Sequence, residues 1–324
     1  MSSLSKKTLN FCDIINLCQI AQVANIKKIQ FTSSKFAIFA ILVAAFLSSG
    51  MSPFAKIVLQ TVPPLSFTFI RFFFAFLILV IFTKKIPKLS KEHIPVILFS
   101  LLSTLNVILF AYGINKTTAT IGQALYAGVP IVVLTLSYFF LMEKLTLKKV
   151  IGVLIGFIGV VIMILLPMIG SESIHKGDIF GNITIFLGVV LYSIYTALSK
   201  RMQKKYSPIE LTSYFFLTTA IVQLFFLPFE LLKYGAWWNN LNPFIYIAFA
   251  YIILLSTVFY YFLYQYAIKK ASPIVTSMIF YLQPAVAYAW SYVLLSERLT
   301  PEFIIGTGLT LFGVYLTTTN KAHS

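Results

Sequence analysis

Charged residues are scarce in this chain of 324 residues, where they make up only 10% of the sequence. Soluble domains carry about 25% charged residues. Apolar residues account for 59% of the chain, and they come in runs close to the roughly 20 residues that a helix needs to cross a bilayer. The scarcity of charge excludes a single water-soluble core, and the pattern predicts an all-α membrane protein.

Motifs of catalysis and of metal binding are missing as well. The sequence contains no His-Glu-x-x-His, no Gly-x-Ser-x-Gly and no phosphate-binding Gly-x-x-x-x-Gly-Lys. Cys12 and Cys18 have no zinc or redox spacing, and His93, His175 and His323 fall in loops or the tail. We therefore predict neither enzyme activity nor a metal or cofactor.

Acidic residues are few, and none falls in the middle of an apolar run. The nine carboxylates are Asp13, Glu92, Glu143, Glu172, Asp178, Glu210, Glu230, Glu297 and Glu302. Proton relays through a bilayer usually use buried Asp, Glu or His. This distribution favours facilitated diffusion or exchange over carboxylate-gated proton coupling.

The apolar runs predict ten membrane spans joined by short loops. They lie near 36–57, 65–83, 94–112, 118–142, 147–167, 178–199, 208–230, 244–266, 272–296 and 301–318. With the N-terminus inside, 19 Lys and Arg face inward and 5 face outward, by count along the chain. Positive loops lie on the cytoplasmic side, so we predict an inner-membrane protein with both termini cytoplasmic. The net charge of +16 therefore sets orientation and does not indicate nucleic-acid binding.

The chain repeats itself internally. Residues 112–160 align with 266–314 at a shift of 154, and 15 of these 49 positions are identical by direct count. The first two spans repeat at a shift of 144, which matches Lys56 with Lys200. Five spans followed by five more require the second half to enter the membrane upside down, so we predict two inverted five-helix repeats.

These boundaries predict four segments. Residues 1–34 form a cytoplasmic tail, 35–170 the first repeat, 171–318 the second repeat, and 319–324 a cytoplasmic C-terminal tail. The first tail carries apolar residues at helical spacing between lysine pairs, which fits either an interfacial amphipathic helix or an unstructured leader.

Pro130 and Pro284 occupy equivalent positions in the fourth and ninth spans. A proline inside a helix removes a backbone hydrogen bond, and the freed groups must face protein or water instead of lipid. Paired helix interruptions in two repeats are a pointer to a binding site. The alternative is a pair of kinks that only shape packing.

Polar and aromatic residues gather on several of these spans and predict a central cavity without fixed charge. The candidate substrate-binding residues are Asn106, Gln123, Tyr126, Tyr192, Tyr195, Tyr260, Ser277, Tyr281, Gln283 and Tyr288. Hydroxyls, amides and ring faces suit an organic solute with polar and apolar parts, including a cation held over the rings. The alternative is interfacial tyrosine and hydrogen bonding between helices.

Three further features have structural as well as functional interpretations. Arg71 is the most deeply placed charge, and it either contacts the solute or a helix end, or reaches the outer headgroups. Glu143 and Glu297 lie at equivalent helix ends, where capping or pairing is expected. Small residues at Gly152, Gly156 and Gly159 predict close helix packing.

These residues resemble a known family. Each half ends in Glu, Lys or Arg, Leu and Thr before a glycine-containing apolar helix, within residues 139–159 and 293–313. This arrangement, with Lys56 and the Arg71-Phe72 pair, is similar to the EamA-type transporters of the drug/metabolite transporter superfamily. The resemblance covers residues 36–318 and does not extend to the N-terminal tail. It implies ten helices around a cavity, alternating access, and solutes such as amino acids, other metabolites or drugs.

The prediction is therefore a transporter of small organic solutes in the lipid bilayer, with no nucleic-acid partner and an undetermined oligomeric state. The competing interpretation is a membrane-embedded enzyme or lipid-handling protein, which requires ionisable groups that converge near one interface. A non-transporting scaffold is a third interpretation, and it leaves the polar lining without a purpose.

Overall fold

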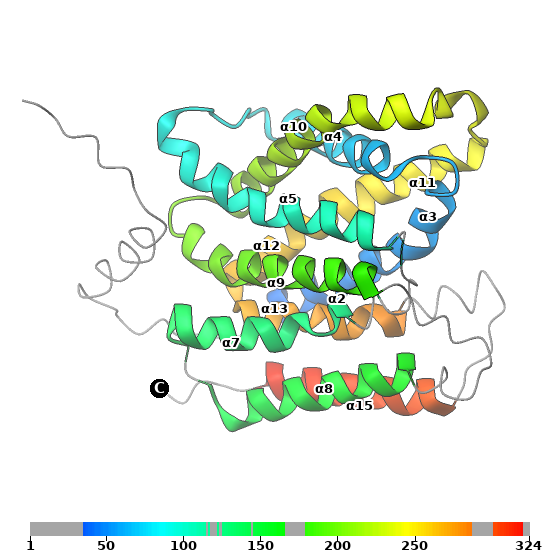
Figure 1. The fold of residues 1–324 in the computed structure, drawn as a ribbon. Helices are drawn as coiled ribbons and strands as arrows, with labels where there is room; N and C mark the ends of the chain where they lie inside the picture. The colour runs from blue at the N-terminus through cyan, green and yellow to red at the C-terminus, as the bar shows by residue number, and fades with distance from the viewer. Residues whose placement is uncertain are drawn as a thin grey trace, which may run out of the picture. The chain divides into compact units, whose positions relative to one another are not determined.

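The computed structural model describes residues 35–286, with gaps at 115, 117–121, 123–124, 144 and 166–178, and residues 301–319. These residues belong to one compact unit, 33–320. Every regular element in the described ranges is helical (Figure 1). The tail at 1–34, Gln123, Tyr288 and Glu297 lie outside the described residues, so the predictions made for them stay predictions.

The described first half contains seven elements. They are α2 (Lys35–Ser49), α3 (Met51–Val58), α4 (Pro64–Thr83), the short 3-10 helix η1 (Lys91–His93), α5 (Ile94–Ile114), α7 (Val129–Leu141) and α8 (Leu147–Leu165). The described second half contains eight elements. They are α9 (Ile179–Met202), α10 (Pro208–Tyr234), η3 (Trp237–Asn240), α11 (Pro243–Ile253), the π-helix η4 (Leu254–Phe259), α12 (Tyr260–Lys270), α13 (Pro273–Ser277) and α15 (Pro301–Thr318).

Five helical stretches in the described residues are long and apolar enough to cross a membrane. They are Pro64–Thr83, Lys91–Ile114, Ile179–Met202, Pro208–Tyr234 and Pro243–Lys270. Shorter apolar helices of 10–17 residues cover Phe36–Ser49, Val129–Leu141, Pro273–Val286 and Ile304–Thr318. Large apolar side chains remain exposed along these helices, for example Ile81, Phe82 and Leu232. This surface suits lipid, and the prediction of an all-helical membrane fold is confirmed.

Proline and short polar residues set where several helices begin. Pro64, Pro208, Pro243 and Pro273 each lie in the first turn of their helix, where a missing N–H is tolerated. Ser207 caps α10 through a capping box with Glu210. The breakers in the sequence therefore end one span and start the next, as predicted.

Glu230 joins α10 to the start of α4. Its buried carboxylate accepts hydrogen bonds from the backbone N–H groups of Leu65 and Ser66, at 2.8 and 2.6 Å, and from the Ser66 hydroxyl at 2.7 Å. A carboxylate at a helix N-terminus satisfies free N–H groups and complements the helix dipole. This bond fixes the second span against the seventh.

Helical structure is interrupted in four of the spans within the described residues. Gly50 separates α2 from α3, Gly128 precedes α7, η4 breaks the eighth span, and a turn at Met278 follows α13. Pro130 lies in the first turn of α7, so the interruption is at Ala127 and Gly128 just before it.

Glycines let α8 and α15 pack against each other (Figure 1). A Cβ at Gly159 would lie 2.7 Å from the carbonyl oxygen of Gly306, and one at Gly313 would lie 2.5 Å from that of Gly152. Only glycine permits such close approach of two backbones. The predicted packing role of the fifth-span glycines is confirmed.

Two of the three glycines of α15 give a matched test of this contact. Gly313→Ala should lower stability by about 1–3 kcal/mol, because the new methyl meets backbone atoms of α8 that cannot move aside. Gly308→Ala should be neutral or stabilising by up to about 1 kcal/mol, because nothing lies within 4 Å of its Cβ position and alanine favours helix. Thermal unfolding of the purified protein in detergent measures both, and equal effects would contradict the packing assignment.

Candidate functional site

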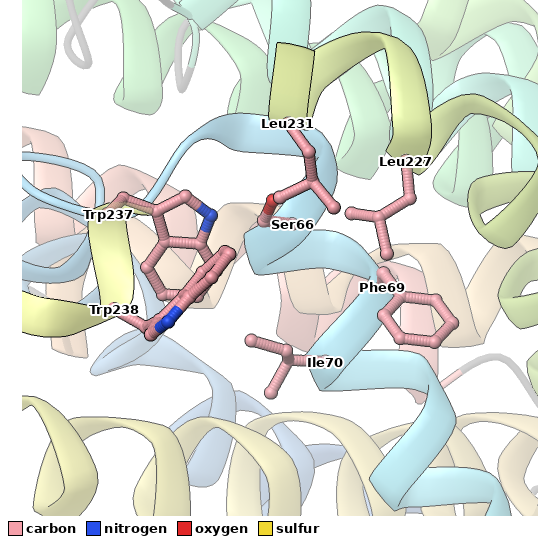
Figure 2. Close-up of a pocket in the computed structure, with 7 residues that line it drawn as sticks. All are labelled: Ser66, Phe69, Ile70, Leu227, Leu231, Trp237 and Trp238. Carbon is pink, nitrogen blue, oxygen red and sulfur yellow. The ribbon is translucent and has the colours of Figure 1, made fainter. Parts of the chain in front are cut away.

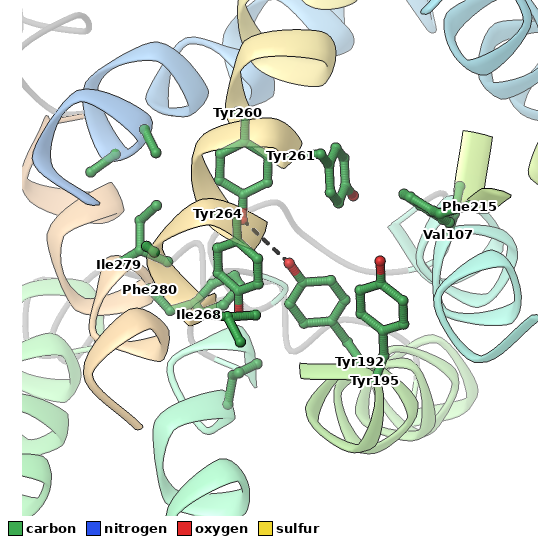
Figure 3. Packing of buried hydrophobic residues seen from close by; sticks show 14 of the residues in the cluster. Val107, Tyr192, Tyr195, Phe215, Tyr260, Tyr261, Tyr264, Ile268, Ile279 and Phe280 are labelled. Atoms are coloured by element: carbon green, nitrogen blue, oxygen red, sulfur yellow. Dashed lines mark hydrogen bonds between the residues drawn. The ribbon is translucent and has the colours of Figure 1, made fainter. Parts of the chain in front are cut away.

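Four buried tyrosines lie where α9 faces α12. Tyr192 and Tyr195 are one helical turn apart on α9, and Tyr260 and Tyr264 are one turn apart on α12, so each pair projects from one helix face. Figure 3 shows the two pairs pointing toward one another. Each side chain is at most 6% exposed. The structure therefore brings four of the predicted site residues together.

Hydroxyl and ring contacts join the two tyrosine pairs. We call these four tyrosines, together with Phe280 and Tyr261, the aromatic cluster. The hydroxyls of Tyr192 and Tyr260 lie 3.5 Å apart, and that of Tyr264 lies 2.9 Å from Oγ1 of Thr196 (Figure 3). The Tyr192 ring meets Phe280 edge to face at 5.6 Å between centroids. The predicted hydroxyl-and-ring lining is present, and in this structure the rings contact one another.

Asn106 and Tyr126 extend the cluster toward α5. The Asn106 amide donates to the Tyr126 hydroxyl at 2.5 Å and to the Gly188 carbonyl at 2.9 Å. A Cβ at Gly188 would lie 3.2 Å from the Asn106 amide nitrogen, so the glycine makes room for this bond. The Tyr126 ring lies 5.9 Å from Phe280, which is its counterpart at the 154-residue shift. Asn106 and Tyr126 thus belong with the four tyrosines.

The remaining predicted site residues have partners elsewhere. The Ser277 hydroxyl donates to Ile274 in its own helix at 2.8 Å. The Gln283 amide donates to the Ser48 hydroxyl of α2 at 2.8 Å. The Tyr281 hydroxyl donates to the Val153 carbonyl of α8 at 2.9 Å, and its ring lies against Gly156. The Gln283 and Tyr281 bonds hold helices together, and none of the three bonds reaches the tyrosine pairs.

Pro130 and Pro284 are both buried in protein. Pro130 follows the interruption at Gly128, while Pro284 lies within helical residues 279–286, beyond the turn at Met278. The fourth and ninth spans touch one another through α7 and α13. The interruptions therefore flank Tyr126 and Phe280, the two rings that meet between the halves.

The position of Arg71 was the hardest to predict from the sequence, which left two alternatives open. Arg71 is 9% exposed, and its Nε donates to the Thr257 hydroxyl in η4 at 2.6 Å. Its burial excludes the predicted alternative in which Arg71 reaches the outer headgroups. Tyr126, Tyr192, Tyr260 and Tyr261 lie near its guanidinium. One buried cation thus lies beside the aromatic cluster, and the expected lining without fixed charge stays a prediction.

A second polar network joins α9 and α12 at the C-terminal ends of both helices. Gln265 donates to the Tyr195 hydroxyl at 2.9 Å and to Ser199 at 3.1 Å, and its carbonyl groups accept from Gln203 at 2.8 Å. The Lys200 ammonium donates to the carbonyls of Ile268, Lys269 and Ala271 at the end of α12. These bonds tie the two helix ends together beneath the tyrosines.

Sequence reasoning missed Gln265, Thr196 and Tyr261. The available signal was spacing, because Gln265 lies one turn after Tyr261, and Thr196 one turn after Tyr192. The pairing expected at Glu143 was predicted better. Glu143 pairs with Lys149 at 2.7 Å, which confirms its expected structural role.

A separate pocket of about 220 Å³ lies between α4 and α10 at the η3 turn (Figure 2). It is lined by Ser66, Phe69, Ile70, Leu227, Leu231, Trp237 and Trp238. None of these is a predicted site residue, and the lining carries no charge. Among the described residues no group of three His, Cys, Asp or Glu is arranged to hold a metal ion.

Comparisons with known proteins agree with this architecture. An uncharacterized transporter of Archaeoglobus fulgidus is 32% identical over 187 residues, which cover 58% of this chain and 63% of that relative. The uncharacterized transporters YetK and YoaV of Bacillus subtilis are 26% and 27% identical over 82% and 81% of this chain, and over 82% and 90% of their own. The match thus spans less than two thirds of the archaeal relative.

A solved crystal structure of a protein superimposes with a TM-score of 0.71 and covers 86% of this chain and 95% of its own. Its sequence identity is 15%, so it shows the fold alone. The model of the EamA-like transporter family matches residues 35–165 and again 179–319, one match in each half. Together with the apolar helices, these matches make the chain a multi-pass membrane protein, and it belongs to the EamA-like transporter family.

Proposed function

We propose that the protein transports small organic solutes, such as amino acids, other metabolites or drugs, across the inner membrane by alternating access. The observation that carries the proposal is the convergence of Asn106, Tyr126, Tyr192 and Tyr260 in one buried cluster drawn from both halves. Polar groups inside a membrane protein are costly and tend to mark a transport pathway.

The contacts between helices support two inverted repeats. Elements that correspond in the two halves pair with each other: α4 with α10, α7 with α13, and α8 with α15. One further contact occurs as an exchanged pair, because α5 packs on α9 as α12 packs on α2. A two-fold axis in the membrane plane produces this reciprocity. These contacts support five spans in each half, and the excess of positive charge on one set of loops supports both termini in the cytoplasm.

The hydrogen bonds at the two ends of α12 support a gating scheme. The Gln265 and Lys200 network holds the cytoplasmic ends of α9 and α12 together, by the orientation predicted from the positive loops. The other end of the eighth span contacts α2 through the Tyr251 and Ser256 hydroxyls, which donate to the Leu47 carbonyl at 3.0 and 2.9 Å. Both ends are closed here, and transport requires each set of bonds to open in turn.

Counterflow in proteoliposomes tests transport itself. Vesicles that contain the purified protein are loaded with one unlabelled solute at a time, and uptake of the same labelled solute is followed against empty liposomes. A solute carried by alternating access should show transient accumulation that depends on the internal load. Uptake equal to that of empty liposomes across amino acids, organic acids and amines would contradict the proposal.

Two substitutions that each remove one hydroxyl distinguish a role in the proposed site from a role in helix packing. Tyr260→Phe should reduce flux severalfold, because it removes a hydroxyl that faces Tyr192 in the proposed site. Tyr281→Phe should leave flux per folded protein unchanged and lower stability by about 0.5–1.5 kcal/mol, because it removes one buried hydrogen bond to α8. Unaltered flux in Tyr260→Phe would remove that hydroxyl from the site.

A reversible cross-link tests opening at the cytoplasmic end. Cys12 and Cys18 are first replaced by serine, and Gln203→Cys and Gln265→Cys are then combined, because these side chains lie 2.8 Å apart. Bridging them with a short bifunctional thiosulfonate should abolish flux, and a reductant should restore it. Each single-cysteine variant treated in the same way is the control. Full flux in protein whose bridge is verified by mass would exclude opening between α9 and α12.

A further inference from the structure

Arg71 is the one buried cation among the residues that the structure describes, and it has no carboxylate partner there. We propose that Arg71 binds a carboxylate group of the transported solute, whose apolar part lies against the aromatic cluster. This inference rests on the transport function proposed above, and it adds the charge of the solute.

The π-helix η4 holds the guanidinium in place. Arg71 Nε donates to Oγ1 of Thr257, and Nη2 donates to the Ser256 carbonyl at 3.4 Å. The Thr257 hydroxyl in turn donates to the Ile252 carbonyl at 2.7 Å, and the Ser256 hydroxyl donates to Leu47. A π-turn is costly and frequently occurs at functional sites. Here it aims one carbonyl and one hydroxyl at an arginine on another helix.

These bonds satisfy only part of the guanidinium. Arginine carries five N–H donors in a planar fork, and it stays charged in proteins. The two bonds above use Nε and one donor of Nη2, the Tyr261 hydroxyl lies within hydrogen-bonding reach of the guanidinium, and the Phe72 ring lies 4.9 Å from Cζ. An acceptor that takes two parallel N–H bonds, as a carboxylate does, matches the donors that remain.

The described carboxylates are all engaged or placed elsewhere. Glu143 pairs with Lys149, Glu210 caps α10, and Glu230 caps α4. Glu92 lies exposed in η1, and Glu302 lies in the first turn of α15. An uncompensated charge inside a membrane protein is expensive, and such residues commonly serve the solute pathway. The missing negative charge is therefore the one that the solute brings.

The surroundings of Arg71 connect it to the site. The hydroxyls of Tyr126, Tyr192, Tyr260 and Tyr261 lie within range of electrostatic interaction with the guanidinium. Three of these four are residues that the sequence assigned to the solute site. Because the hydroxyls donate or accept as required, they can orient an anion beside the fork without adding a second charge.

The two halves differ at this position, which gives the site a direction. The repeat counterpart of Arg71 is Phe215, whose ring lies 4.9 Å from Tyr261 and 5.8 Å from Tyr195. The two repeats therefore supply different groups to the neighbourhood of Tyr261, a cation from α4 and an aromatic ring from α10. This asymmetry suits a solute with a carboxylate at one end and an apolar body at the other. A single cation also matches a monoanion better than a phosphate dianion.

Thermal unfolding with matched probes tests the inference without a flux measurement. Wild-type protein is unfolded with sodium 3-phenylpropionate, with neutral 3-phenylpropionamide, with 3-phenylpropylamine, and with inorganic phosphate, all at constant ionic strength. The carboxylate should raise the unfolding midpoint, because a ligand that binds only the folded state stabilises it. The amide, the amine and phosphate should give smaller shifts or none.

Arg71→Gln should weaken carboxylate binding about tenfold or more, as expected for loss of a charge-assisted bond. Arg71→Lys, which keeps the charge and loses the fork, should weaken it less. The midpoint of Arg71→Gln without a probe should equal or exceed that of wild type, because the substitution removes a buried, unpaired charge. A merely structural arginine would lower that midpoint. Lys204→Gln removes an exposed cation and serves as the matched control.

Three results would overturn the inference: an equal shift with the amide, a carboxylate shift that survives Arg71→Gln, or no shift with any anion. A shift with phosphate alone would assign the site to inorganic phosphate instead of a carboxylate. A failure of the transport proposal can be told apart from a failure of this inference. It would leave carboxylate binding intact while counterflow stays at the level of empty liposomes. Counterflow of neutral solutes without any effect of Arg71→Gln would keep transport and remove the carboxylate.

Discussion

A bilayer interior offers no water to polar groups, so most buried hydroxyls, amides and charges in the described residues are bonded to a partner within the chain. Many hydroxyls solve this locally, as Ser100 and Ser193 do by donating to the carbonyl four residues earlier. Others bond to a different helix. The Glu230 carboxylate bonds to the first residues of α4, and the Tyr281 hydroxyl bonds to α8. Such bonds fix which helices are neighbours.

The same constraint makes exceptions informative. Arg71 has hydroxyl, carbonyl and ring contacts but no counter-charge among the described residues, and it lies beside the tyrosines that both halves contribute. Packing alone would be served equally well by an apolar side chain, as the counterpart position Phe215 shows. The departure from symmetry at one position in two otherwise matching halves therefore has a functional explanation in the solute.

Flexibility in this architecture is local. Interruptions at Gly50, Gly128, Met278 and η4 divide the spans that meet the cluster, whereas α8 and α15 pack through glycines and stand apart from it. The contacts of α9 with α12 and of α2 with the eighth span include the Gln203–Gln265 and Ser256–Leu47 hydrogen bonds, and the proposed alternating access requires these to open in turn.

The sequence by itself determined the membrane class, the positions of most spans, the repeat and the family resemblance, because hydrophobic run length and breakers act locally along the chain. It also grouped Asn106, Tyr126, Tyr192 and Tyr260 through helical spacing and the repeat, and the structure shows that they lie together. It did not determine that Tyr281 bonds to α8, or that Arg71 is buried on η4. Those facts depend on how each helix is rotated about its axis. Rotation is set by contacts with helices distant in sequence, and only the tertiary structure decides them.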